Sequence, residues 1–275
     1  MWVRVPPAPQ KVRICEPFYL PVFMSVDYRG QPMAQPPQNM SREQFANAVH
    51  HVIRERKTAK VLRAPDTCFE GGANLPPDFA AALRRCIESA GWAPFHKMIH
   101  KETHLRGKMI SLVPWRFYVL KKSVCCAVVD QVRARAELQP DSKWSRAWTS
   151  KIPRLLSGAG ACVMVTWLPD PAENGGEPVL NENNIEHIAA ASAAAQNLLL
   201  ACESQGMYTY WATGGILRDD DVFDWLRIPR TQKLLGAIFV SPAESVGEGV
   251  TIEAGSLRDQ RGAVEDWSVW IDSLA

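Results

Sequence analysis

The sequence lacks the patterns that would place it in several common functional classes. No apolar run reaches the roughly 18 to 20 residues that a membrane-spanning helix needs. There is no GxSxG, HExxH or GxxxxGK-S/T motif in the chain. These absences remove the signatures of α/β-hydrolase nucleophile elbows, zinc peptidases and P-loop nucleotide-binding proteins.

Neither positive nor negative charge is in excess. The chain has 31 basic and 29 acidic residues, which leaves a formal net charge of +2. This balance gives no general attraction to nucleic acid or to a membrane surface, so any basic cluster must act locally. We therefore expect a soluble, cytoplasmic globular protein with no nucleic-acid or membrane partner.

Cysteine and histidine form no recognisable metal site. No CxxC pair is present, and His96, His100 and His104 share a loop without a cysteine or carboxylate at ligand spacing, so no metal is expected. The cysteines are odd in number and scattered, which predicts reduced thiols in a reducing compartment. The seven are Cys15, Cys68, Cys86, Cys125, Cys126, Cys162 and Cys202.

Composition divides the chain into two parts. Residues 1–40, with "MWVRVPPAPQ" and "GQPMAQPPQN", are Pro-rich and show no helical or strand period, which predicts a disordered N-terminal extension. An organelle-targeting peptide, or a true start at Met24 or Met40, is the alternative. Residues 41–275 are long enough for one domain with a substantial core.

The second part shows alternating helical and strand patterns. Ser41 followed by Gln44 forms a capping box before a helical apolar period, and Gly91 and Gly206 can close two further helices. The predicted helices are 42–55, 77–90, the region 124–156, 184–205 and a short one at 219–228; the predicted strands are 115–120, 160–168, 207–215 and 233–241. This order predicts one α+β domain whose sheet is covered on its faces.

A basic cluster lies where the first predicted helix ends, in "VIRERKTAK". Arg56 and Lys57 are followed at once by the hydroxyl of Thr58. This combination can fix a phosphate through a guanidinium fork and a short hydrogen bond. The alternative is a solvated helix end, because cations at a helix C-terminus are favoured by the dipole.

Five segments in order carry a family resemblance. They are "RKTAK", "AGWAPFHK", "PWRFYVL", "AAAQNLLLACESQGMYTYW" and "ATGG". Over about residues 42–270 the chain resembles the nitroreductase family of flavoproteins, and most of all its compact YdjA-like branch. The resemblance implies an α+β nitroreductase-like fold with a central, mostly antiparallel sheet flanked by helices. It also implies a homodimer that binds FMN at each subunit interface.

The resemblance assigns the basic cluster to the cofactor. Arg56, Lys57 and Thr58 would hold the FMN phosphate and ribityl chain. Lys60 would stand near the pyrimidine edge as a possible N1/O2 stabiliser, because hydride arriving at N5 leaves negative charge over N1 and the C2 oxygen. Lys97 is a second candidate for this task, and a solvated lysine is the alternative for Lys60.

Other cofactor contacts follow from the same resemblance. Gly214 would let backbone approach the flavin ring closely, and residues 201–206 would contact a nicotinamide dinucleotide. Trp211 as an ordinary core aromatic is the alternative to its role beside the ring. The remaining implied contacts are Trp92 and His96 from a loop, Trp211, Ala212 and Thr213 beside the ring, and Arg261 at the phosphate.

The sequence departs from the family pattern in two places. Residues 98–111 are an insertion between His96-Lys97 and Pro114-Trp115, and Leu112-Val113 replace the polar residue often found before that pair. Both departures bear on the substrate pocket and on the role of Lys97.

The function implied is an FMN-dependent NAD(P)H oxidoreductase that reduces nitroaromatics, quinones or related electron-poor acceptors by a ping-pong cycle. No side chain needs to be a nucleophile, because the flavin carries the chemistry. One alternative is a non-catalytic flavin- or nucleotide-binding protein of the same fold. Another is a narrower reductase, such as a dehalogenase or enone reductase. The sequence does not choose the acceptor or decide between NADH and NADPH.

Overall fold

The computed structural model describes residues 37, 39–68, 75–98, 111–170 and 178–273. They belong to two compact units, Met1–Val49 and His50–Ala275. The predicted extension lies almost wholly outside the described residues, as do residues 99–110 of the insertion. The predicted capping box is confirmed: the Gln44 amide donates to Ser41 Oγ at 3.1 Å, and the Ser41 amide donates to Gln44 Oε1 at 2.8 Å.

Most predicted elements are present with small shifts at their ends. The described helices are α1 (Arg42–Glu55), α2 (Phe79–Ala90), α4 (Lys122–Leu138), α5 (Lys143–Trp148), α6 (Lys151–Gly158), α7 (Glu182–Ser204) and α8 (Asp220–Leu226). The strands are β1 (Ala59–Arg63), β2 (Trp115–Lys121), β3 (Ala161–Trp167), β4 (Met207–Ala212), β5 (Lys233–Pro242) and β6 (Val250–Ala254). Among the residues that the structure describes, no helix is both long enough and apolar enough to cross a membrane.

Four strands form the central sheet, in the order β2-β3-β5-β4, and every neighbouring pair is antiparallel. This confirms the predicted antiparallel sheet. Strand β3 is buried along its whole length. Its continuous apolar run is explained by helices on both sides of the sheet.

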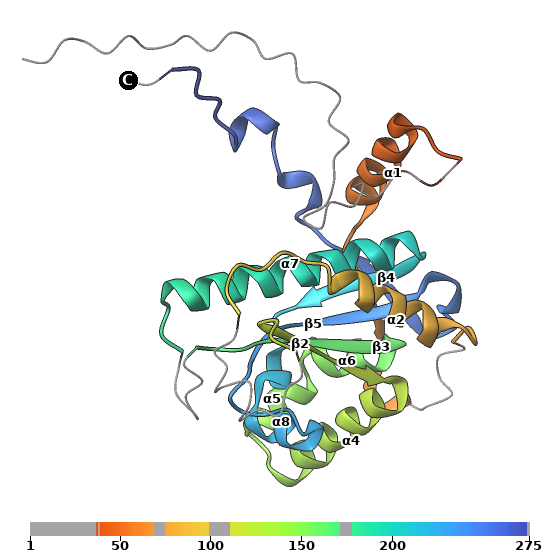
Figure 1. The fold of residues 1–275 in the computed structure, drawn as a ribbon. Helices are drawn as coiled ribbons and strands as arrows, with labels where there is room; N and C mark the ends of the chain where they lie inside the picture. The colour runs from red at the N-terminus through yellow and green to blue at the C-terminus, as the bar shows by residue number, and fades with distance from the viewer. Residues whose placement is uncertain (1–36, 38, 69–74, 99–110, 171–177, 274–275) are drawn as a thin grey trace, which may run out of the picture. The chain divides into compact units, whose positions relative to one another are not determined.

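The helices cover the two faces separately (Figure 1). Successive side chains of a strand point to opposite faces, and β3 shows this directly. Val163 and Val165 pack with α2 and α7, whereas Cys162 and Met164 pack with α4, α5, α6 and α8. The result is a three-layer α+β arrangement, as predicted.

Two local features were not resolved at the sequence level. The region 124–156 is helical as predicted, but it is divided into α4, α5 and α6, because two serines start new helices within it. Ser142 accepts from the amide of Trp144, and Ser150 accepts from that of Ile152, and such caps favour a new helix start. Strands β1 and β6 were not predicted, and together they form a second, two-stranded sheet.

The prediction that all cysteines are reduced was wrong for one pair. Cys68 and Cys126 form a disulfide although they are 58 residues apart in sequence. Sequence spacing could not show this contact, because tertiary packing brings the segment after β1 against α4. The four other described cysteines are free and buried. Because one pair is oxidised, the cysteines no longer support the prediction of a reducing compartment.

Lys122 gives a testable pH dependence. Its side chain is buried, its Nζ donates to the Ser157 carbonyl at 2.5 Å, and burial lowers its pKa from 10.5 to about 8. Between these values the unfolded chain binds more protons than the folded one, so stability increases as pH rises. We expect the free energy of unfolding to increase by up to about 3 kcal/mol between pH 8 and 10.5. Chemical denaturation should show this increase in the wild type and not in Lys122→Met; equal slopes would contradict it.

Candidate functional site

The register of β1 and β6 brings distant basic residues together. The two strands are antiparallel, and Ala59 pairs with Ala254. Residues after Ala254 therefore lie beside residues before Ala59. The Gly255 amide donates to the Thr58 carbonyl at 3.1 Å and continues this pairing. The C-terminal segment thus runs back along the end of α1.

Arg258 uses this proximity to bind the end of α1. Its guanidinium donates to the carbonyls of Glu55 at 3.1 Å and Arg56 at 3.3 Å, and also to that of Arg54. These are carbonyls that a helix C-terminus leaves without intrahelical partners. The contribution of Arg258 was missed at the sequence level. The one available signal was its spacing of three residues from the predicted phosphate ligand Arg261.

Arg56, Arg258 and Arg261 form a cluster of positive charge, which we call the arginine cluster. Arg261 Nη1 donates to the Arg258 carbonyl at 2.8 Å. Burial lowers the pKa of Arg56, and the charges of Arg261 and Arg258 lower it further, while Glu203 acts in the opposite direction. Arg56 thus lies near two further positive charges, and Glu203 partly offsets them. Such an arrangement favours binding of an anion.

Lys60 lies farther along the same chain segment. Thr58 and Lys60 are two residues apart in an extended chain and therefore share one face of the strand. Lys60 Nζ is 3.8 Å from Glu253 Oε2 and 5.8 Å from the centroid of the Tyr210 ring. Its side chain is only 19% exposed, so it is not a solvated lysine. Lys151 approaches the same carboxylate, at 3.7 Å.

Strand β4 lies beside this segment. A parallel bridge joins Thr58 to Thr209, so residues 58–60 run in the same direction as the chain leading to Gly214. Trp211 is partly buried and packs over Gly236, where an added Cβ would be 2.1 Å from the indole Nε1. Its position thus fits the core-aromatic alternative as well as a place beside a ring.

The segment after β4 includes a glycine with an unusual backbone conformation. Ala212 is buried, Thr213 is exposed, and Gly214 has a φ of 110°, which L side chains rarely adopt. The predicted cofactor contacts come from three parts of the chain: the basic cluster, the loop of Trp92 to Lys97 and the segment 211–214. The structure brings the basic cluster and the segment 211–214 together.

The loop of Trp92 to Lys97 lies apart from the arginine cluster. Trp92 is 88% exposed, and Lys97 is exposed as well. His96 Nδ1 is 3.4 Å from Glu186 Oε2, near the start of α7, whereas Glu203, whose charge acts on Arg56, is near the end of that helix. Glu186 and Glu203 are about 26 Å apart along the helix axis at 1.5 Å per residue.

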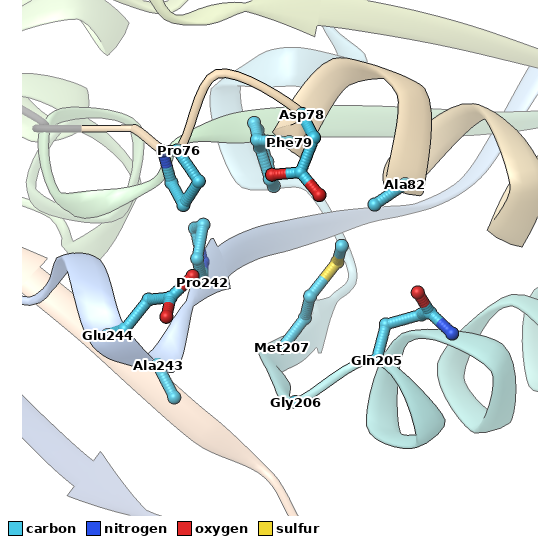
Figure 2. Close-up of a pocket in the computed structure, with 10 residues that line it drawn as sticks. All are labelled: Pro76, Asp78, Phe79, Ala82, Gln205, Gly206, Met207, Pro242, Ala243 and Glu244. Atoms are coloured by element: carbon cyan, nitrogen blue, oxygen red, sulfur yellow. The ribbon is translucent and has the colours of Figure 1, made fainter.

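A small pocket of about 240 Å³ lies between the start of α2 and the end of α7 (Figure 2). Phe79 and Met207 form apolar parts of its wall. Asp78 and Glu244 contribute carboxylates, and none of the lining residues is cationic. Its lining includes Gln205 and Gly206, which were predicted to contact a dinucleotide. These carboxylates would repel a pyrophosphate group, so that contact gains no support from the pocket.

A sequence model described as the nitroreductase family matches residues 79–240. This range covers more than half of the chain and includes α2, α7 and nearly all of the central sheet. The chain belongs to the nitroreductase family. The predicted family is thereby confirmed.

Two solved structures are similar to this chain. A nitroreductase-like family protein from Bacillus cereus is 19% identical, with a TM-score of 0.53, and the match covers 87% of this chain and 100% of that one. A nitroreductase with bound FMN from Bacteroides fragilis NCTC 9343 is 18% identical, with a TM-score of 0.48 and coverage of 82% and 98%. The first likeness shows a common fold. No curated protein sequence matches significantly.

The family match begins at Phe79, after the basic cluster and β1. It also ends before Arg258 and Arg261. The arginine cluster of this nitroreductase-family protein is therefore formed by segments on both sides of the matched region. Its role as a phosphate site stays a prediction from the motif "RKTAK" and from the geometry described above.

Proposed function

We propose that this nitroreductase-family protein is an FMN-dependent oxidoreductase that takes reducing equivalents from NADH or NADPH. Its acceptors would be electron-poor molecules such as nitroaromatics or quinones. Family membership supports an oxidoreductase, and the geometry of the arginine cluster supports the cofactor.

The arginine cluster is the observation that carries this proposal. Arg56 and Arg261 would bind the FMN phosphate, and Thr58 would add a hydroxyl. Arg258 is already bound to the α1 carbonyls and would fix the position of Arg56. The donor set fits a phosphate, because guanidinium groups donate planar, charge-assisted hydrogen bonds to its oxygens.

Lys60 and the end of β4 would hold the flavin ring. When bound, FMN would supply the hydride-transfer chemistry. Lys60 would place positive charge near the pyrimidine edge, and Glu253 would hold its ammonium in place. Gly214 would permit close backbone approach. Protein side chains would thus bind, orient and electrostatically stabilise the cofactor.

A second copy of the chain would complete the site. The loop of Trp92, His96 and Lys97 is exposed and lies far along α7 from the arginine cluster. The C-terminal segment also exposes large apolar side chains, with Trp267 at 65% and Trp270 at 88%. Exposed aromatic residues of this kind are typical of interfaces. We therefore propose a homodimer in which the Trp92 loop serves the cofactor of the partner subunit.

Absorption spectroscopy of the purified full-length protein tests the function. We expect protein-bound flavin absorption that NADH or NADPH bleaches under anaerobic conditions and that menadione or nitrofurazone restores. A flavin that responds to neither would support a non-catalytic binding protein. Activity with halogenated phenols or enones alone would support a narrower reductase. Protein that takes up no FMN supplied in excess would contradict the proposal.

Replacing Lys60 tests the part of the site that would hold the flavin ring. Lys60→Met should keep FMN but lower its two-electron potential by about 30 mV, the equivalent of a tenfold loss of preference for the reduced form. Lys151→Met is the matched control, because Lys151 approaches the same Glu253 carboxylate. Spectroelectrochemical titration should show a shift only for Lys60→Met. An unchanged potential would count against the predicted N1/O2 role.

A further inference from the structure

Arg218 is held by backbone carbonyls and not by carboxylates. Its Nε donates to the Thr213 carbonyl at 2.7 Å, Nη1 to that of Leu234 at 2.7 Å and Nη2 to that of Leu235 at 3.1 Å. Among the described residues no carboxylate lies within ion-pair distance of it. The fork thus joins the segment after β4 to the start of β5.

The charge of Arg218 is therefore not neutralised by an acid. Burial lowers its pKa, but an arginine keeps its proton in a protein. Arg230 lines the same cavity of about 480 Å³, yet it is paired with Asp220 and Asp224. Of these two arginines, only Arg218 places an unbalanced charge against the segment that contains Gly214.

The contact with Thr213 also fixes a peptide plane. In a trans peptide the carbonyl oxygen and the following N–H point in opposite directions. Because the Thr213 carbonyl points to Arg218, the Gly214 N–H points away from it. That N–H has no hydrogen-bond acceptor within the ranges that the structure describes. An added Cβ at Gly214 would be 2.5 Å from Leu234 Cδ2 and 3.6 Å from Arg218 Cγ, so the backbone lies close against these side chains.

We infer that Arg218 is a positioning residue of the redox site. It holds the Thr213–Gly214 peptide with the Gly214 N–H available to the cofactor, and its unbalanced charge favours the reduced, more negative form. This inference rests on the proposed FMN function. It concerns a residue outside the five segments that carried the resemblance.

Two variants separate the charge of Arg218 from its geometry. Arg218→Gln removes the charge, whereas Arg218→Lys keeps it but cannot reproduce a planar fork to three carbonyls. Arg230→Gln is the matched control, because it removes a nearby arginine that is already paired with acids. Each full-length protein is reconstituted with FMN. The dissociation constant of oxidised FMN and the two-electron potential are then measured.

Arg218→Gln should reduce the preference for reduced FMN about tenfold, which lowers the potential by about 30 mV. Arg218→Lys should retain most of the potential but bind oxidised FMN about tenfold more weakly. Arg230→Gln should change neither quantity.

Wild-type values in both Arg218 variants would overturn the inference, as would an equal potential shift in Arg230→Gln. If Arg218→Gln does not fold, the Lys variant decides: wild-type FMN affinity there overturns the positioning role. A wild-type protein that binds no FMN would refute the proposed function itself. Normal FMN binding with unaffected variants would refute only the role of Arg218.

Discussion

Arg56→Ala is expected to bind FMN about 10- to 100-fold more weakly than the wild type. The variant removes charge-assisted hydrogen bonds worth about 1.5 to 3 kcal/mol. It also removes the guanidinium that lies closest to Thr58 in sequence, which is partly buried and lies near the charges of Arg261 and Arg258. Fluorescence titration of apoprotein with FMN measures the change directly.

Arg84→Ala is the control for that experiment. Arg84 is 83% exposed on α2 and pairs with Glu88 at 3.2 Å, so its loss changes net charge without affecting the arginine cluster. We expect its FMN affinity to remain within a factor of about 2 of the wild type, because its charge is screened by solvent. Equal losses in both variants would indicate a nonspecific charge effect. Full affinity in Arg56→Ala would refute the phosphate role.

Gly158→Ala is expected to destabilise the fold by about 3 kcal/mol or more. Gly158 ends α6 where that helix packs against β1, and an added Cβ would be 2.2 Å from the Val61 carbonyl oxygen. A backbone atom cannot rotate away, so α6 and β1 must separate. Because β1 follows Thr58 and carries Lys60, we also expect weaker FMN binding. Chemical denaturation monitored by circular dichroism measures the stability loss.

Gly247→Ala is the matched control for the glycine. An added Cβ there meets no atom within 4 Å, and its φ is not positive. Its free energy of unfolding should stay within about 0.5 kcal/mol of the wild type. A wild-type stability for Gly158→Ala would show that α6 does not depend on this close approach.

The central part of the fold could be predicted from sequence patterns. The apolar run of β3 and the alanine- and leucine-rich α7 are long, strong signals, because both elements are buried on most sides. The Ser41–Gln44 capping box was equally local and was confirmed. Features that depend on neighbouring residues in the chain were thus available from the sequence alone.

Features that depend on long-range pairing were not available. Strands β1 and β6 have five residues each and are paired with each other across most of the chain. The partners Cys68 and Cys126 carry no spacing signal. Arg258 was missed for the same reason, since its acceptors are more than 200 residues away. The β1–β6 pairing, the disulfide and the contacts of Arg258 could be recognised only once the tertiary structure was known.

The central claim is that the arginine cluster of one chain and the Trp92 loop of another enclose a single FMN. Sedimentation velocity of reconstituted protein, recorded at once in the protein and flavin absorption bands, tests it most directly. The account predicts that flavin sediments with a dimer at one FMN per chain. It also predicts that Arg56→Ala gives a dimer with little flavin. Stoichiometric FMN on a monomer, or a dimer that never carries flavin, would contradict it.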